Sequence, residues 1–167
     1  MEQRPHLSFE RWIAFVFDHP VPDPGALNWY WSERKHCISS MFSLFERFFA
    51  PRCSSHLSHL DTMETDTSNV SPLNMICYMW WDILPIYGKP GELDHREIDA
   101  ACLEVMRLTL DLDSDACRES ALHGLGHWEY IYPIEVKTII NAWLARNPLL
   151  TGEVKAYAHA ARRGRVR

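Results

Sequence analysis

The chain has 167 residues, of which 47% are hydrophobic and 23% are charged, and its net charge is −5. These proportions are typical of one globular domain and exclude a disordered, low-complexity or collagen-like chain. No run of 18 or more uncharged apolar residues is present, and the first residues lack the basic and apolar stretches of a secretory signal. We therefore expect a single domain over residues 1–167, a cytoplasmic location and no membrane partner.

The charge is distributed unevenly along the chain. No acidic residue follows Glu153, and the last segment carries five cations: Lys155, Arg162, Arg163, Arg165 and Arg167. The preceding residues hold 12 cations against 22 anions, a net charge of −10. A body this acidic repels phosphate backbones and attracts basic partners, so nucleic-acid binding by the tail is the less favoured interpretation. We expect the tail to neutralise part of the body or the C-terminus of its own helix.

The first 49 residues are predicted to form a pair of helices. Ser8 is a suitable N-cap, and apolar residues at helical spacing follow it up to Pro20. Further prolines indicate an extended connector, because a residue before proline disfavours the helical conformation. A second helix is predicted from about Ser32 to Phe49, with a broad aromatic face, and Pro51 ends it.

Residues 50–71 are rich in Ser, Thr and Asp and are predicted to form a long loop with room for one helical turn. A loop of this length in a small domain is usually functional or mobile. Ser71 as N-cap and Pro72 at the first helical position then predict a third helix, which Pro85 ends. This helix is apolar nearly all round, which favours a central position.

The remaining chain reads as four helices joined by short turns. We predict N-caps at Asp94, Ser114 and Thr151, and Pro133 at the start of the third of these helices. No segment alternates as a strand does. The predicted fold is therefore all-α, a compact α-α superhelix of six to seven helices, because short turns place neighbouring helices antiparallel.

Part of the C-terminal half resembles a known repeat. The run Asp113–His127 resembles the first helix of a HEAT-like repeat of the phycobilisome-lyase type, through Arg118, Ala121, Leu122, Gly124, Leu125 and Gly126. The match covers roughly a quarter to a third of the chain, and it implies that residues 72–167 are HEAT-like helices followed by a basic tail. No second copy at a fixed period is visible, and residues 1–90 do not look like repeats.

The whole chain also resembles an uncharacterised family of small bacterial proteins. The similarity is carried by Phe17–Pro20, Met79–Asp82 and Glu119–Trp128. It implies a bacterial, cytoplasmic origin and no particular chemistry.

Two groups of histidines are candidates for a metal site. Glu119, His123 and His127 follow one another at intervals of four residues, so on a helix they project in one row. Two imidazoles one turn apart can both ligate a cation, with Glu119 as a third ligand or a supporting acceptor. Alternatively, the histidines pack between helices and bond carbonyls freed near Gly124 and Gly126.

A second set of possible ligands lies on the long loop: Cys53, His56, His59 and Asp61. The favoured interpretation is that these are solvated loop side chains. Whether His56 and His59 meet His123 and His127 cannot be read from the sequence. The five cysteines contain no CxxC pair and are expected to be reduced, with Cys102 and Cys117 on buried stripes where nucleophilic chemistry is not expected.

The aromatic content suggests a binding surface. Seven tryptophans are more than a small core needs, and adjacent ones cannot all face inward from one helix. We predict a surface that binds a basic partner and is formed by Trp80, Trp81, Asp82, Trp128 and Tyr130. No phosphate loop or other cofactor motif appears, and no cofactor is predicted.

Three functions follow from these observations. The favoured hypothesis is a non-enzymatic protein-interaction module that binds a basic partner through an acidic, aromatic-edged surface, in an immunity- or antitoxin-like role. The alternative is a metal-assisted hydrolase or lyase that uses Glu119, His123 and His127. The third is nucleic-acid binding by the arginine tail.

Overall fold

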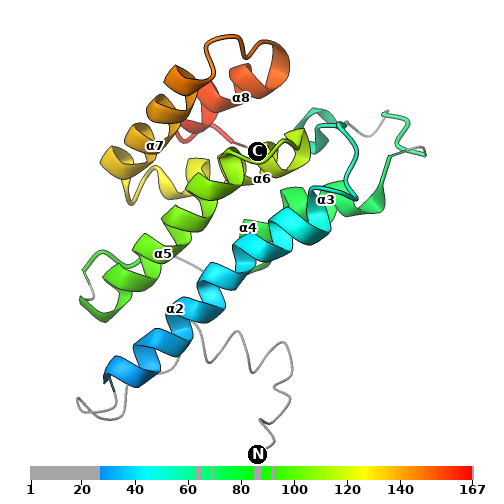
Figure 1. Cartoon of the computed structure of the whole chain (residues 1–167). Coiled ribbons are helices and arrows are strands. Elements are labelled where there is room, and N and C mark those ends of the chain that lie inside the picture. Colours follow the sequence, from blue (N-terminus) through cyan, green and yellow to red (C-terminus); the bar gives the residue numbers. More distant parts are fainter. Residues whose placement is uncertain (1–26, 63–64, 69, 85–87, 92, 167) are drawn as a thin grey trace, which may run out of the picture.

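The computed structural model describes residues 27–62, 65–68, 70–84, 88–91 and 93–166. Within these ranges the chain forms seven α-helices, one π-helical turn and one 3-10 turn, and no strand (Figure 1). The prediction of an all-α helical array is confirmed. The predicted helix that follows Ser8 lies outside the described residues.

Helix α2 (Leu27–Leu44) continues into a π-helical turn, η2 (Phe45–Phe49), and packs along α5 (Leu93–Leu110). Its buried side chains recur every three or four residues and form one apolar stripe: Ile38, Met41, Phe45 and Phe49. The sequence predicted a helix from Ser32, but the described chain is already helical at Leu27. The predicted end at Phe49 is confirmed.

Within the part of residues 50–71 that the structure describes, the long loop contains one 3-10 turn, η3 (Ser58–Leu60), as the sequence allowed. Its first part is held by the buried Asn74 of α3 (Pro72–Tyr78). The Asn74 side chain accepts a hydrogen bond from the Ser54 amide at 3.0 Å and donates to the carbonyls of Ser54 and His56 at 3.0 and 2.8 Å. The loop therefore returns to the body of the protein at residues 54–60.

The single helix predicted after Ser71 is two helices in the structure. The Ser71 side chain caps α3 as predicted, accepting from the Leu73 amide at 3.3 Å. The helical path is interrupted at Met79, whose φ and ψ of −80° and 5° lie outside the α-helical range, and α4 (Trp80–Ile83) follows. This change of direction places Asp82 next to α6 (Asp115–Trp128).

The C-terminal helices agree closely with the prediction. Ser114 caps α6 by accepting from the Cys117 amide at 3.4 Å, and Pro133 begins α7 (Pro133–Arg146). Helix α5 begins at Leu93, so Asp94 lies inside the helix and is not its N-cap. Thr151 precedes α8 (Gly152–Ala161) but makes no capping hydrogen bond.

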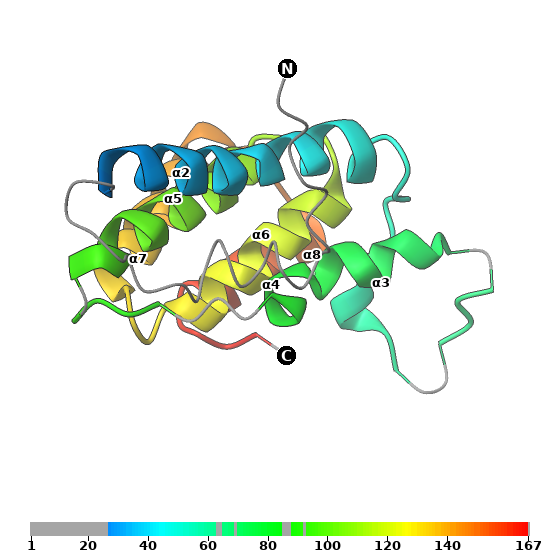
Figure 2. The ribbon, with the colours of Figure 1, turned by 90° about the horizontal axis from the view of Figure 1, so that it is seen from below.

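Helix α6 is the centre of the molecule. It contacts α3, α4, α5, α7, α8 and η2, and eleven of its 14 residues are buried. Figure 2 shows α6 running through the middle of the helices that surround it. Small residues permit this close packing: a Cβ added to Gly124 would lie 2.6 Å from the Trp81 ring. Polar residues on α6 are therefore carried into the interior.

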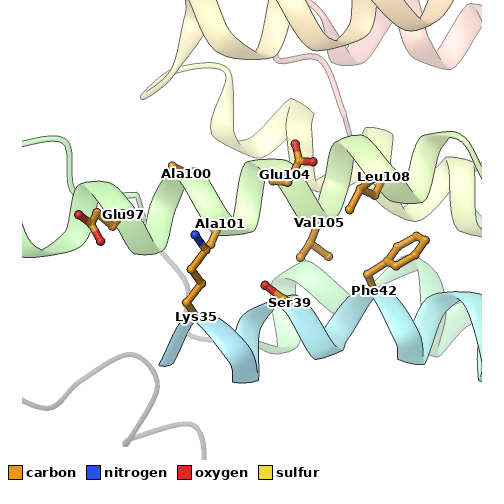
Figure 3. Close-up of a pocket in the computed structure, with 9 residues that line it drawn as sticks. All are labelled: Lys35, Ser39, Phe42, Glu97, Ala100, Ala101, Glu104, Val105 and Leu108. Atoms are coloured by element: carbon orange, nitrogen blue, oxygen red, sulfur yellow. The ribbon is translucent and has the colours of Figure 1, made fainter. Parts of the chain in front are cut away.

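Two further features bear on function. A groove of about 710 Å³ separates parts of α2 and α5 (Figure 3). Its lining residues are Lys35, Ser39, Phe42, Glu97, Ala100, Ala101, Glu104, Val105 and Leu108.

Among the described helices, none combines the length and the hydropathy that crossing a bilayer requires.

Candidate functional site

Three side chains from two helices converge on one point. His123 Nε2 lies 2.9 Å from Asp82 Oδ2, and His127 Nε2 lies 3.3 Å from Asp82 Oδ1. The two imidazole Nε2 atoms are themselves 3.0 Å apart. We call these three residues the Asp82 cluster. They form a group of potential metal ligands whose atoms all lie within 4.8 Å of one another.

These distances suit a shared cation better than hydrogen bonds alone. A ring nitrogen offers one in-plane position, either a hydrogen or a lone pair. Each Nε2 faces both the carboxylate and the other Nε2, so no placement of hydrogens on neutral rings satisfies all three contacts. A tetrahedral ion with bonds of about 2.0–2.1 Å separates its ligand atoms by roughly 3.3 Å. The observed separations of 2.9–3.3 Å are close to that value.

Tyr157 of α8 orients the ring of His123. Its hydroxyl lies 2.9 Å from His123 Nδ1 and 3.4 Å from the Tyr78 hydroxyl. Burial raises the pKa of Tyr157, so its hydroxyl keeps its proton. When this hydroxyl donates its proton to the Tyr78 oxygen, the Tyr157 oxygen accepts from His123 Nδ1–H, which leaves the Nε2 lone pair of His123 directed at the Asp82 cluster.

The cluster is buried on one side and open on the other. His123 is 1% exposed, whereas the side chains of Asp82 and His127 are 32% and 47% exposed. Burial lowers the pKa of His123, and this outweighs the opposing attraction of Asp82. The neutral imidazole, which is the form that ligates metals, is thus favoured at neutral pH.

Glu119, the predicted third ligand, belongs to a different group. Its carboxylate accepts hydrogen bonds from the amides of Ser58 and His59 at 3.0 and 2.8 Å, and it lies 2.6 Å from His59 Nδ1. We call Glu119, Ser58 and His59 the Glu119 cluster. The prediction that Glu119 is a third ligand beside His123 and His127 is wrong for a geometric reason. Residues eight apart on a helix are separated by about 12 Å along its axis. Glu119 and His127 therefore cannot share one ion.

His59, His123 and His127 are linked through contacts with Tyr157 and with one another, whereas His56 pairs within the loop. The His59 ring stacks on Tyr157 at a centroid distance of 3.9 Å, and the Tyr157 hydroxyl reaches His123. His59 and His123 therefore contact the same tyrosine, His59 at the face of its ring and His123 at its hydroxyl. His56 pairs with Asp61 at 2.7 Å within the loop. His56, His59 and Asp61 are therefore held in defined contacts. This corrects the expectation that they are solvated loop side chains.

Two of the five residues predicted to form the aromatic surface are interior. Trp81 and Trp128 are each 4% exposed, so neither can contact a partner. Trp81 stacks over Phe45 at 6.1 Å and covers Gly124, which explains its burial. Trp80 is half-buried, and Tyr130 is 92% exposed. Only Asp82 of the predicted set lies in the histidine cluster.

Sequence reasoning missed two partners in this region. No role was predicted for Tyr157 from the sequence, although a buried tyrosine hydroxyl requires a hydrogen-bond partner. Asp82 was placed on a binding surface, although an isolated carboxylate in an apolar helix also needs a cation or a donor nearby. Both signals are present in the sequence, but neither identifies the histidines as the partners.

Comparisons of the chain with protein-family models, with curated proteins and with solved structures found no match. The resemblances to a HEAT-like repeat and to a family of small bacterial proteins therefore stay predictions.

Proposed function

We propose that the protein binds one divalent transition-metal ion through Asp82, His123 and His127 and uses it in hydrolysis or a related lyase reaction. The convergence of the three ligand atoms within 4.8 Å supports this proposal most directly. Two imidazoles and one carboxylate are a donor set found in catalytic zinc sites, where three protein ligands leave a fourth position for water or substrate.

The donor set also selects the kind of ion. Imidazole nitrogens suit zinc, cobalt, nickel, copper and iron, whereas magnesium and calcium prefer oxygen ligands. A metal held by these residues would lower the pKa of a bound water and would so supply a nucleophile at neutral pH. The half-exposed His127 side chain marks the side from which a substrate would approach.

Residues around the Asp82 cluster hold its ligands in position without being ligands themselves. Tyr157 fixes the tautomer and the ring plane of His123 through Nδ1. The Trp81 ring packs against Gly124 and so fixes α4, and with it Asp82, against α6. A site held by packed helices needs less reorganisation on binding than a site on a free loop.

The first experiment is metal binding. Protein purified without chelator should contain about one equivalent of a transition metal, and the apoprotein should bind Co²⁺ with visible ligand-field bands. His127→Ala should weaken Co²⁺ binding by more than about 100-fold, because it removes a direct ligand. His36→Ala removes an exposed histidine of α2 and serves as the control. Equal Co²⁺ affinity in the wild type and His127→Ala would contradict the proposal.

A protein-interaction module is the second candidate, and the groove between α2 and α5 favours it (Figure 3). The groove has an apolar floor that includes Phe42 and Val105, and the exposed Glu97 at its edge suits a basic partner. An immunity- or antitoxin-like role is one form of this candidate. Glu97→Lys should release a basic partner from the purified chain, whereas Glu153→Lys on α8 should not. Equal retention by both variants would argue against it.

A further inference from the structure

The C-terminal tail, residues 162–166, folds back onto the end of α6. Gly164 adopts a left-handed φ of 66°, and the amides of Gly164 and Arg165 bond the carbonyls of Ala161 and Ala160 at 2.9 and 3.0 Å. This turn ends α8 in a defined geometry. It sends Val166 directly onto Gly126, where an added Cβ would collide with the Val166 side chain.

The same contact places the tail beside the Asp82 cluster. Successive residues of a helix point about 100° apart. The direction of His127 therefore lies between that of Gly124, which faces Trp81 of α4, and that of Gly126, which faces Val166. This spacing points the half-exposed His127 side chain between α4 and the tail. Figure 2 shows the red tail passing below the C-terminal half of α6, in the view in which α4 also lies below that helix.

The tail carries two uncommitted positive charges on either side of Gly164, which lies against the Gly126 carbonyl of α6. Arg163 and Arg165 are exposed, and within the described part of the chain no ion pair is formed by either. Arg162 differs, because its guanidinium donates to Asn141 at 2.7 Å. Glu129, the acid nearest to Gly164, is neutralised by Lys137 at 2.9 Å. The arginines are therefore not needed to balance that carboxylate.

We infer that Arg163 and Arg165 form a cationic edge of the metal site and that its ligand or substrate is an oxyanion of the phosphate-ester class. A divalent ion held by two neutral imidazoles and one carboxylate keeps a net positive charge, which favours an anion in the open position. The planar guanidinium forks of two arginines match phosphate oxygens in charge and geometry. This inference rests on the proposed metal-binding function and adds the substrate class to it.

The experiment uses the Co²⁺-loaded full-length protein and inorganic phosphate as the probe. Phosphate should change the visible Co²⁺ spectrum, and its affinity should fall as NaCl is raised. The double variant Arg163→Gln, Arg165→Gln should bind phosphate at least about ten-fold more weakly, since each charge-assisted hydrogen bond contributes appreciably. Its Co²⁺ affinity should stay that of the wild type. Arg47→Gln, an exposed arginine on η2, is the control.

A second variant moves the tail without removing a charge. Gly126→Ala forces Val166 off α6, so it should weaken phosphate binding while the Co²⁺ ligands stay in place. Failure of the wild type to bind Co²⁺ would overturn the proposed function and this inference together. Normal Co²⁺ binding with phosphate affinity unchanged by the double variant would overturn the inference alone. A loss of phosphate affinity confined to the tail variants would support it.

Discussion

Helix α6 takes part in two carboxylate–histidine groups, which differ in the residue that α6 supplies and in the exposure of the carboxylate. In the Glu119 cluster the acid lies on α6 and is 1% exposed, and the amides of Ser58 and His59 donate to it. In the Asp82 cluster the histidines lie on α6, and the carboxylate comes from α4 and is 32% exposed. One tyrosine, Tyr157, touches both groups.

The difference shows how burial and donor supply decide what such a group does. Glu119 has three donors and almost no contact with solvent, so its oxygens are satisfied, and it anchors the long loop to the body. Asp82 faces the Nε2 atoms of two histidines, which lie 3.0 Å from each other, and the His127 ring is half-exposed. The first group is closed to solvent and structural, whereas the second is partly open to solvent at Asp82 and His127.

The largest effect, a loss of stability, is expected from removing the carboxylate of the Glu119 cluster. Glu119→Ala leaves two amides and the His59 ring without their acceptor, and breaking such a buried pair costs about 3–5 kcal/mol. The free energy of unfolding from urea denaturation, together with faster proteolysis within residues 50–71, measures this loss. Glu119→Gln keeps an acceptor oxygen and should lose less. A Glu119→Ala variant as stable as the wild type would remove the distinction between the two groups.

The next effect concerns the residue that joins the two groups. Tyr157→Phe removes the hydroxyl from His123 Nδ1 and should weaken Co²⁺ binding by roughly 10–100-fold, while stability falls by only about 1 kcal/mol. Tyr130→Phe alters a tyrosine that is 92% exposed and should leave both quantities unchanged. Co²⁺ titration and urea unfolding of the two variants separate these effects. Equal Co²⁺ affinities in the two variants would show that Tyr157 does not position the ring.

A loss of stability is also expected from Gly124→Ala, which disturbs the packing that holds α4, and with it Asp82, against α6. The new Cβ would lie 2.6 Å from Trp81, next in sequence to Asp82. Overpacking of this kind costs about 1–3 kcal/mol, offset in part by the better helix propensity of alanine. Gly91→Ala is the matched control, because nothing lies within 4 Å of its added Cβ. Thermal unfolding should rank the wild type and Gly91→Ala together, above Gly124→Ala.

The smallest effect is a pH dependence of the metal-free protein. Burial lowers the pKa of His123, so the unfolded chain binds a proton more readily than the folded one. The stability is fully present above the unfolded value of about 6.5 and is lost as the pH falls below it. Unfolding free energies at pH about 7.5 and about 5.5, with chelator present, should therefore differ more in the wild type than in His123→Asn. A larger difference in His123→Asn would reverse the assigned sign.

Local signals predicted most of the fold. Ser71, Ser114 and Pro133 begin helices where the sequence placed those starts, because capping and proline geometry depend on a few neighbouring residues. The break at Met79 was not predicted, since residues 72–83 carry no glycine or internal proline after Pro72. Packing against α6 decided that change of direction, and it brought Asp82 to the histidines.

The candidate site was predicted only in part. His123 and His127 were identified because two residues one turn apart on a helix must share a face. Their third partner was assigned to Glu119 on the same helix, whereas the structure supplies Asp82 from 41 residues earlier in the chain. Helical spacing relates residues within one element and contains no information about which other element packs on that face.

The sequence by itself determined the helical class, most helix boundaries and the face on which the histidines lie, since each depends on local spacing and capping. Only the tertiary structure decided which acid meets which histidine, that Trp81 and Trp128 are interior, and that Val166 of the basic tail packs on Gly126. These outcomes depend on how helices separated by dozens of residues pack around α6. That packing is set by the fit of many side chains together, which no single pattern in the sequence records.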